Sequence, residues 1–182
     1  MIFKKDYRCF KQGDKVEFRP GVNLLVGDQG CGKTTIIELL TNKKHAGQVV
    51  KDVISIDHDK VYFRAFDFER DNPRTQGRVD TMGQLACLFS SHGEASYAIS
   101  KAVEKFDESL IFFDEPDMAL SIRSCNKLVN LFKRLSETKQ IIAAVHNPTV
   151  IAAFPEVLSL EHHCWMTSDQ FIKSHEEAND TL

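Results

Sequence analysis

The chain has 182 residues, of which 42% are hydrophobic and 27% are charged, and its formal net charge is −3. This composition is typical of one globular domain with a sizeable core. The small negative charge excludes a global basic field of the kind that holds nucleic acid or anionic membranes. The five cysteines form no Cys-x-x-Cys pair, so we expect reduced thiols and a cytoplasmic protein. The N-terminus has no apolar signal region and no apolar run approaches about 18 residues, so we expect no membrane association.

The first 22 residues are predicted to form an antiparallel β-hairpin region, because short apolar and polar runs alternate around Gly13-Asp14. Short buried strands are then predicted at residues 22–27, 61–68, 109–113, 140–145 and 157–160. Helical periodicity follows at residues 34–40, 95–106 and 128–135. Strands separated by helices indicate parallel pairing with right-handed crossovers, so the predicted fold class is α/β. We expect residues 1–182 to form a single domain whose tail, residues 174–182, is disordered.

The segment from Gly27 to Thr34 fits the phosphate-loop motif G-x-x-x-x-G-K-[ST] in full, between a predicted strand and a predicted helix. Its glycines let successive backbone N–H groups turn toward phosphate oxygens, and the helix adds the positive end of its dipole. We predict that Lys33 reaches the β- and γ-phosphates and that the Thr34 hydroxyl ligates Mg²⁺. The predicted nucleotide-binding residues here are Gly27, Asp28, Gln29, Gly30, Cys31, Gly32, Lys33, Thr34 and Thr35.

Two later strands are predicted to end in catalytic residues: Asp114 and Glu115 follow one apolar run, and His146 follows the next. The carboxyl ends of parallel strands border the crevice where ligands of α/β sheets bind. We predict that Asp114 joins Thr34 in holding Mg²⁺, and that Glu115 orients and deprotonates an attacking water. His146 would hydrogen-bond the γ-phosphate or that water. The alternatives are an ordinary Asp-Glu-Pro surface turn and a structural histidine.

In this order, a phosphate loop, the polar segment SSHGEAS (90–96), an Asp-Glu strand end and a His strand end resemble the ATP-binding-cassette (ABC) class of ATPases. The separations fit as well, with 21 positions from Gly93 to Asp114 and 32 from Asp114 to His146. The chain looks most like small stand-alone predicted ATPases of this class, on the side of the SMC-like DNA-repair heads. The resemblance covers residues 8 to 160 and implies a P-loop NTPase fold with a mainly parallel sheet flanked by helices. It also implies ATP and Mg²⁺ as cofactors.

The resemblance gives the polar segment a role across a dimer interface. Ser91 matches the serine of the family's signature motif, Gly93 its second glycine and Glu94 its terminal acid. In this family the signature docks against ATP held by a second subunit, head to tail. A helix that begins near Glu94 would offer free N–H groups and a positive dipole end to that phosphate. The alternative is a plain capping box, in which Ser91 caps the helix and Glu94 lies three residues on.

The sequence departs from the family pattern at three points. His92 replaces the usual first signature glycine, and Ser121 stands where transporters of the class usually carry aspartate. The family's Q-loop glutamine is missing from the end of the strand at 61–68, where Asp67 is the nearest polar residue. Adenine contacts are expected from the hairpin region, with Tyr7, Arg8 and Phe10 as candidates, although Phe10 also suits the core.

Residues 70–106 are predicted to hold only a reduced, very short helical lid and the signature helix. This short span argues against a transporter subunit and against a DNA clamp with its own coiled coil. We therefore expect a homodimer on ATP binding and a separate effector protein. Nucleic acid is possible but not indicated, because the arginines of residues 64–78 are mixed with acids. His162-His163-Cys164 is interpreted as accidental rather than as a metal site.

The predicted function is Mg²⁺-dependent ATP hydrolysis by a head that dimerises on ATP and drives or gates a partner protein. An alternative is an ATP-gated recruitment switch with negligible turnover, which would use the same dimerisation. A small P-loop nucleoside or nucleotide kinase is a third hypothesis, compatible with the chain length. Steady-state turnover and phosphoryl transfer to added nucleosides or nucleotides distinguish the three.

Overall fold

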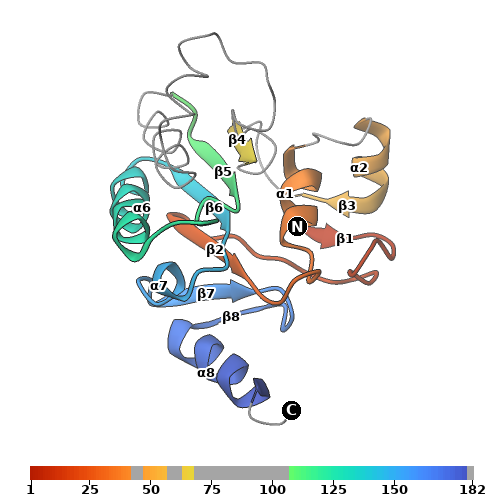
Figure 1. Cartoon of the computed structure of the whole chain (residues 1–182). Coiled ribbons are helices and arrows are strands. Elements are labelled where there is room, and N and C mark those ends of the chain that lie inside the picture. The colour runs from red at the N-terminus through yellow and green to blue at the C-terminus, as the bar shows by residue number, and fades with distance from the viewer. Residues whose placement is uncertain (42–46, 57–62, 68–106, 180–182) are drawn as a thin grey trace, which may run out of the picture.

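The computed structural model describes residues 1–41, 47–56, 63–67 and 107–179. A six-stranded sheet with the strand order β4-β5-β6-β2-β7-β8 forms its centre (Figure 1). The strands are β2 (Val22–Val26), β4 (Phe63–Asp67), β5 (Leu110–Asp114), β6 (Gln140–Ala144), β7 (Glu156–Ser159) and β8 (Cys164–Thr167). From β4 to β7 all neighbours are parallel, and β8 pairs antiparallel with β7. The predicted α/β class with a mainly parallel sheet is therefore confirmed.

The parallel strands β2, β5, β6 and β7 are buried on both faces, which explains why their sequences are mostly apolar. Leu24, Ile111 and the residues in phase with them pack against helix α6 (Ile122–Leu135). Leu25, Phe112 and their counterparts pack against helix α1 (Lys33–Thr41). The two helices accordingly lie on opposite sides of the sheet (Figure 1).

The predicted N-terminal hairpin is present and has an additional neighbour. Phe3 N–H donates to Asp14 O at 2.9 Å, and Val16 N–H donates to Met1 O at 2.9 Å. Strand β1 (Ile2–Phe3) also pairs antiparallel with β3 (Ile54–Ser55), which follows helix α2 (Gly47–Val53). The sequence analysis predicted neither β3 nor α2, because both are short and α2 contains a glycine and three valines.

The C-terminal end differs from the prediction. Helix α8 (Ser168–Asn179) continues through most of the tail that was expected to be disordered from residue 174, so that prediction is wrong up to Asn179. The helix is anchored by the buried Phe171 and by Ser168, whose hydroxyl donates to Phe154 O. A further short helix, α7 (Pro148–Ile151), follows β6.

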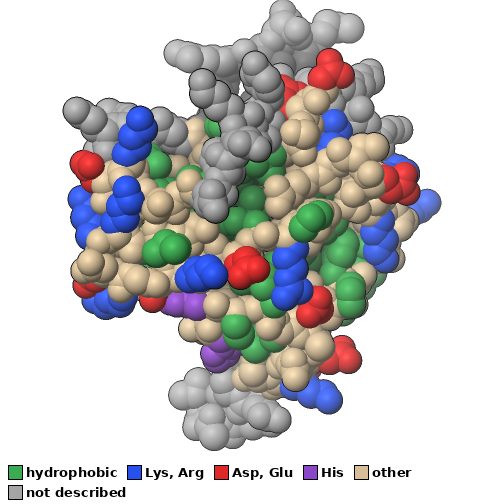
Figure 2. All heavy atoms as spheres, turned by 180° about the vertical axis from the view of Figure 1, so that it is seen from behind, with side chains coloured by type: hydrophobic (Ala, Val, Ile, Leu, Met, Phe, Trp, Pro, Cys, Tyr) green, Lys and Arg blue, Asp and Glu red, His purple; other side chains and the backbone are tan. Residues whose placement is uncertain are grey.

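On the face opposite to the one seen in Figure 1, apolar side chains form patches near the middle, with Lys, Arg, Asp and Glu side chains between and around them (Figure 2). Within the described ranges, every helix is too short or too polar to cross a lipid bilayer. The division of the chain into a single domain, with a reduced lid at residues 70–106, stays a prediction, because that lid lies outside the described residues.

Candidate active site

The phosphate loop follows the carboxyl end of β2, as predicted, and its backbone requires glycine. Gly27, Gly30 and Gly32 have φ angles of 139°, 89° and 103°. At Gly32 the space is also closed, since an added Cβ would lie 2.5 Å from the Phe10 ring and 2.6 Å from Cys9 Sγ. The loop is therefore built directly against the N-terminal hairpin region. Phe10 is 1% exposed, so it serves the core rather than a bound base.

The Lys33 side chain folds back against the backbone of this loop. This side chain is buried, and Nζ donates to Gly27 O at 2.6 Å and to Asp28 O at 2.9 Å. The Cys31 Sγ atom lies 3.5 Å from the same amine. Burial raises the pKa of the Cys31 thiol, and the neighbouring Lys33 charge opposes that rise only in part. An ammonium group held by loop carbonyls is well placed to exchange them for phosphate oxygens.

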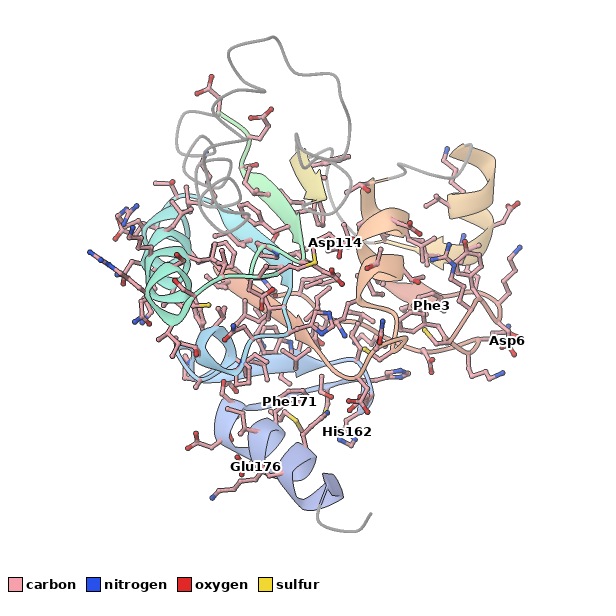
Figure 3. All side chains as sticks on the ribbon, viewed as in Figure 1. Phe3, Asp6, Asp114, His162, Phe171 and Glu176 are labelled. Atoms are coloured by element: carbon pink, nitrogen blue, oxygen red, sulfur yellow. The ribbon has the colours of Figure 1, made fainter. Side chains whose placement is uncertain are left out.

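Thr34 and Asp114 meet at the mouth of the loop. The Thr34 hydroxyl donates to Asp114 Oδ1 at 3.1 Å, although the two residues are 80 positions apart. Asp114 is 7% exposed and lies at the carboxyl end of β5 (Figure 3). A hydroxyl and a carboxylate are hard oxygen donors of the kind Mg²⁺ prefers. These two residues fit the predicted magnesium site in both chemistry and position.

Arg8 joins the hairpin region to the first turns of α1. Its guanidinium donates to Thr35 Oγ1 and to Glu38 Oε2, both at 2.9 Å. Glu38 is 6% exposed, so the ion pair is sheltered on the carboxylate side. The sequence analysis named Arg8 and Tyr7 only as candidates for adenine contact. The contact to Thr35 places Arg8 beside the end of the loop motif.

Glu115 and His146 face each other across neighbouring strand ends. His146 Nε2 lies 3.4 Å from Glu115 Oε1, and both side chains are partly exposed. Glu115 has a φ angle of 54°, and its N–H donates to Ala144 O at 3.1 Å. A left-handed φ is uncommon for a residue other than glycine and is found at functional sites. The structure thus brings together the two predicted catalytic side chains.

A cavity of about 320 Å³ lies beside the loop and has a wall that the sequence analysis did not foresee. Gly27, Asp28, Gln29 and His146 line it from the strand ends, and Phe171 and Glu176 line it from α8. Figure 3 shows these two α8 residues below the sheet, with Asp114 on the strand above them. Helix α8 therefore contributes directly to the surroundings of the loop.

A cluster of one imidazole and two carboxylates connects α8 to the phosphate loop. His175 Nε2 lies 3.3 Å from Glu161 Oε2 and 3.6 Å from Asp28 Oδ1. The Asp28 N–H donates to the Glu161 carboxylate. The ligand-type atoms of these three residues lie within 4.8 Å of one another, yet nothing in the sequence pattern marks them as a group. They connect segments that are 133 and 14 residues apart.

The remaining predicted residues have mixed outcomes. The signature residues Ser91, Gly93 and Glu94 lie outside the described residues, and so does His92. Asp67 pairs in register with Asp114 through the backbone. Ser121 has a local role as the N-cap of α6. His163 of the histidine pair lies 3.5 Å from Asp14 and stacks on Phe10.

Comparison with known proteins agrees with this geometry. An AAA domain family matches residues 5–42, which contain the hairpin region from residue 5 and the phosphate loop. Curated relatives include ABC transporter G family member 33 of Arabidopsis thaliana and the ATP-dependent permease AUS1 of Saccharomyces cerevisiae, each 23% identical. The alignments cover 79% and 78% of this chain but only 14% and 13% of those proteins, so the chain spans about a seventh of their length.

Solved structures show the same likeness. A metal-chelate type ABC transporter in an inward-facing conformation has a TM-score of 0.53 at 16% identity, over 84% of this chain and 74% of that one. A dimeric ATP-binding cassette in a post-hydrolysis state, bound to ADP and Pi, has a TM-score of 0.52 at 16% identity, over 86% and 90%. The fold of this chain is therefore that of an ATP-binding cassette.

Proposed function

We propose that this chain, an ATPase domain of the ABC class, hydrolyses ATP with Mg²⁺ and dimerises when ATP binds. The observation that carries the proposal is the meeting of two pairs at neighbouring strand ends. Thr34 donates to Asp114 at 3.1 Å, and His146 lies 3.4 Å from Glu115, next to a complete phosphate loop. A surface turn or a purely structural histidine would not require both pairs to converge on this loop.

Each pair has a distinct role in the proposed reaction. Lys33 and the loop amides would hold the β- and γ-phosphates, and Thr34 and Asp114 would hold Mg²⁺. The bound ion would neutralise phosphate charge as the bond to the leaving group breaks. Glu115 would accept a proton from the attacking water at a carboxylate oxygen. His146 would keep that carboxylate oriented through Nε2 and contact the γ-phosphate.

The dimer is proposed from the signature residues. Ser91, Gly93 and Glu94 would present a helix N-terminus to the triphosphate held by the second copy. The dimeric state of the ADP- and Pi-bound cassette supports this arrangement for the fold, since that protein covers 86% of this chain. We propose that the change between monomer and dimer drives or gates a separate effector protein.

The test compares Glu115→Gln with a matched control, Glu137→Gln, on an exposed stretch after α6. Loss of the base should lower steady-state ATP turnover by about 10²–10⁴-fold, while the control keeps wild-type turnover. In size-exclusion chromatography, ATP should shift Glu115→Gln from monomer to dimer. Ser91→Arg added to this variant should abolish the shift and leave nucleotide binding intact.

The same measurements separate the other two hypotheses. If the wild type scarcely turns over and Glu115→Gln behaves identically, the ATP-gated switch replaces hydrolysis as the function. Phosphoryl transfer to an added nucleoside or nucleotide would identify a kinase. A dimer indifferent to nucleotide would contradict both the hydrolysing dimer and the switch.

A further inference from the structure

Asp117 lies two residues after Glu115 and is buried, with 4% of its surface exposed. Its Oδ2 atom accepts two backbone hydrogen bonds from the turn after β6. His146 N–H donates at 2.8 Å and Asn147 N–H at 2.6 Å. One carboxylate oxygen therefore joins the turn that carries Glu115 to the turn that carries His146.

Burial of this carboxylate costs free energy, and the two hydrogen bonds to Oδ2 offset only part of that cost. Among the residues that the structure describes, none donates a hydrogen bond to Asp117 Oδ1, although this atom is buried. A buried carboxylate with one oxygen unsatisfied is unfavourable compared with an apolar side chain of similar size. Burial raises the pKa of the Cys125 thiol, and the nearby Asp117 charge raises it further, so this carboxylate also affects a buried residue of the core. Packing alone does not account for an aspartate at this position.

We propose that Asp117 is a positioning residue for the reaction proposed above: it fixes the His146 backbone so that Nε2 stays beside Glu115. The inference rests on the proposed function only for its effect on turnover. The tether itself is independent of any substrate. Asp117 touches none of the reacting groups and acts through the peptide units of His146 and Asn147.

One backbone–backbone hydrogen bond and two side-chain–backbone hydrogen bonds then hold the two strand ends together. Glu115 N–H donates to Ala144 O at 3.1 Å from one side, and the two Asp117 bonds return from the other. Asn147 is fixed further because its Oδ1 accepts from Thr149 N–H at 2.9 Å and caps α7. The peptide units on both sides of the His146 Cα atom are thus held by hydrogen bonds. The side-chain torsions of His146 are then the main freedom of its imidazole.

A cavity next to His146 leaves room for this residue to move if the two Asp117 hydrogen bonds are lost. A cavity of about 280 Å³ is lined by Glu115, Asp117, Met118, Ala119, His146 and Asn147. The His146 side chain is 44% exposed, so its own packing does not hold it. Loss of the Asp117 bonds would let the turn relax into this space and increase the distance between Nε2 and Glu115.

The experiment compares Asp117→Ala with Asp117→Asn. The asparagine oxygen can accept both N–H groups in place of Oδ2, whereas alanine accepts neither. We expect hydrogen exchange at the His146 and Asn147 amides to be at least tenfold faster in Asp117→Ala, and to be within about threefold of wild type in Asp117→Asn. In ATP hydrolysis, Asp117→Ala should lower kcat by about 10–100-fold with KM within about threefold, and Asp117→Asn should restore kcat.

Two further measurements complete the test. In a His146→Ala background, Asp117→Ala should lower kcat by less than about threefold more, because the tether would have nothing left to position. If Asp117→Ala does not fold, the Asp117→Asn exchange rates decide, since fast exchange in a folded Asp117→Asn overturns the tether. Equal kcat losses in Asp117→Asn and Asp117→Ala would assign the effect to charge and overturn positioning. If the wild type does not hydrolyse ATP, the proposed function fails while the exchange rates still test the tether.

Discussion

The closest approach in the phosphate loop yields a quantitative prediction for Gly32→Ala. Gly32 has a φ of 103°, a conformation that costs a residue with a Cβ about 1–3 kcal/mol. The new methyl group would also overlap the Phe10 ring at 2.5 Å and Cys9 Sγ at 2.6 Å. Phe10 is stacked on Phe3 with ring centroids 4.3 Å apart, so it has little room to yield. Overpacking of this kind costs about 1–3 kcal/mol more.

The matched control is Gly30→Ala in the same loop. Gly30 has a similar φ of 89°, but an added Cβ there would have nothing within 4 Å. Both variants should lose the conformational part, and Gly32→Ala should be less stable than Gly30→Ala by about 1–3 kcal/mol. Urea unfolding of the nucleotide-free chain measures this difference, which corresponds to about 2–12 °C in Tm. Equal losses in the two variants would refute the claim that the hairpin region is built against the loop.

Two further predictions concern the buried strand β2 and the loop thiol. Asn23→Ala should lower the free energy of unfolding by about 2–4 kcal/mol, because the buried Asn23 amide holds backbone groups of Arg19 and Ile141, whereas the exposed Asn126→Ala should change it by less than about 0.5 kcal/mol. Comparable urea midpoints for both would contradict this role. Because burial raises the pKa of Cys31, its alkylation by iodoacetamide, followed by mass spectrometry, should be slower at pH 7.5 than in the urea-unfolded chain. The rate should rise steeply with pH, and rapid modification near neutral pH would show that the thiol is not protected.

The local parts of the site were predictable from the sequence. The spacing of the phosphate loop is fixed, so Lys33 could be placed by counting. Asp114, Glu115 and His146, which are proposed to act in the reaction, stand at or directly after the ends of apolar strands. Parallel strands bring their carboxyl ends to one edge, and this rule placed Glu115 and His146 at the same crevice. In the structure the two side chains lie 3.4 Å apart, a contact that the sequence analysis did not specify.

The long-range parts of the site were not predictable in the same way. The Asp117 carboxylate reaches amides 29 and 30 positions away, and an aspartate after Glu-Pro is equally good turn chemistry. Helix α8 has few apolar residues, so its composition favoured a frayed tail. Its stability depends on Phe171 reaching the core and His175 reaching Glu161, which no periodicity indicates.

Helix α8 lines the cavity beside the phosphate loop, so it offers a second surface through which a bound molecule can affect that loop. Phe171 and Glu176 line the same cavity as Gly27 and Asp28, so a molecule that binds the helix would also affect the conformation of the phosphate loop. Thermodynamic linkage works in both directions: if such a molecule changes the affinity for nucleotide, nucleotide changes the affinity for that molecule by the same factor. If the chain acts on an effector as proposed, an effector bound to α8 would respond to nucleotide in the loop without contacting the proposed dimer interface.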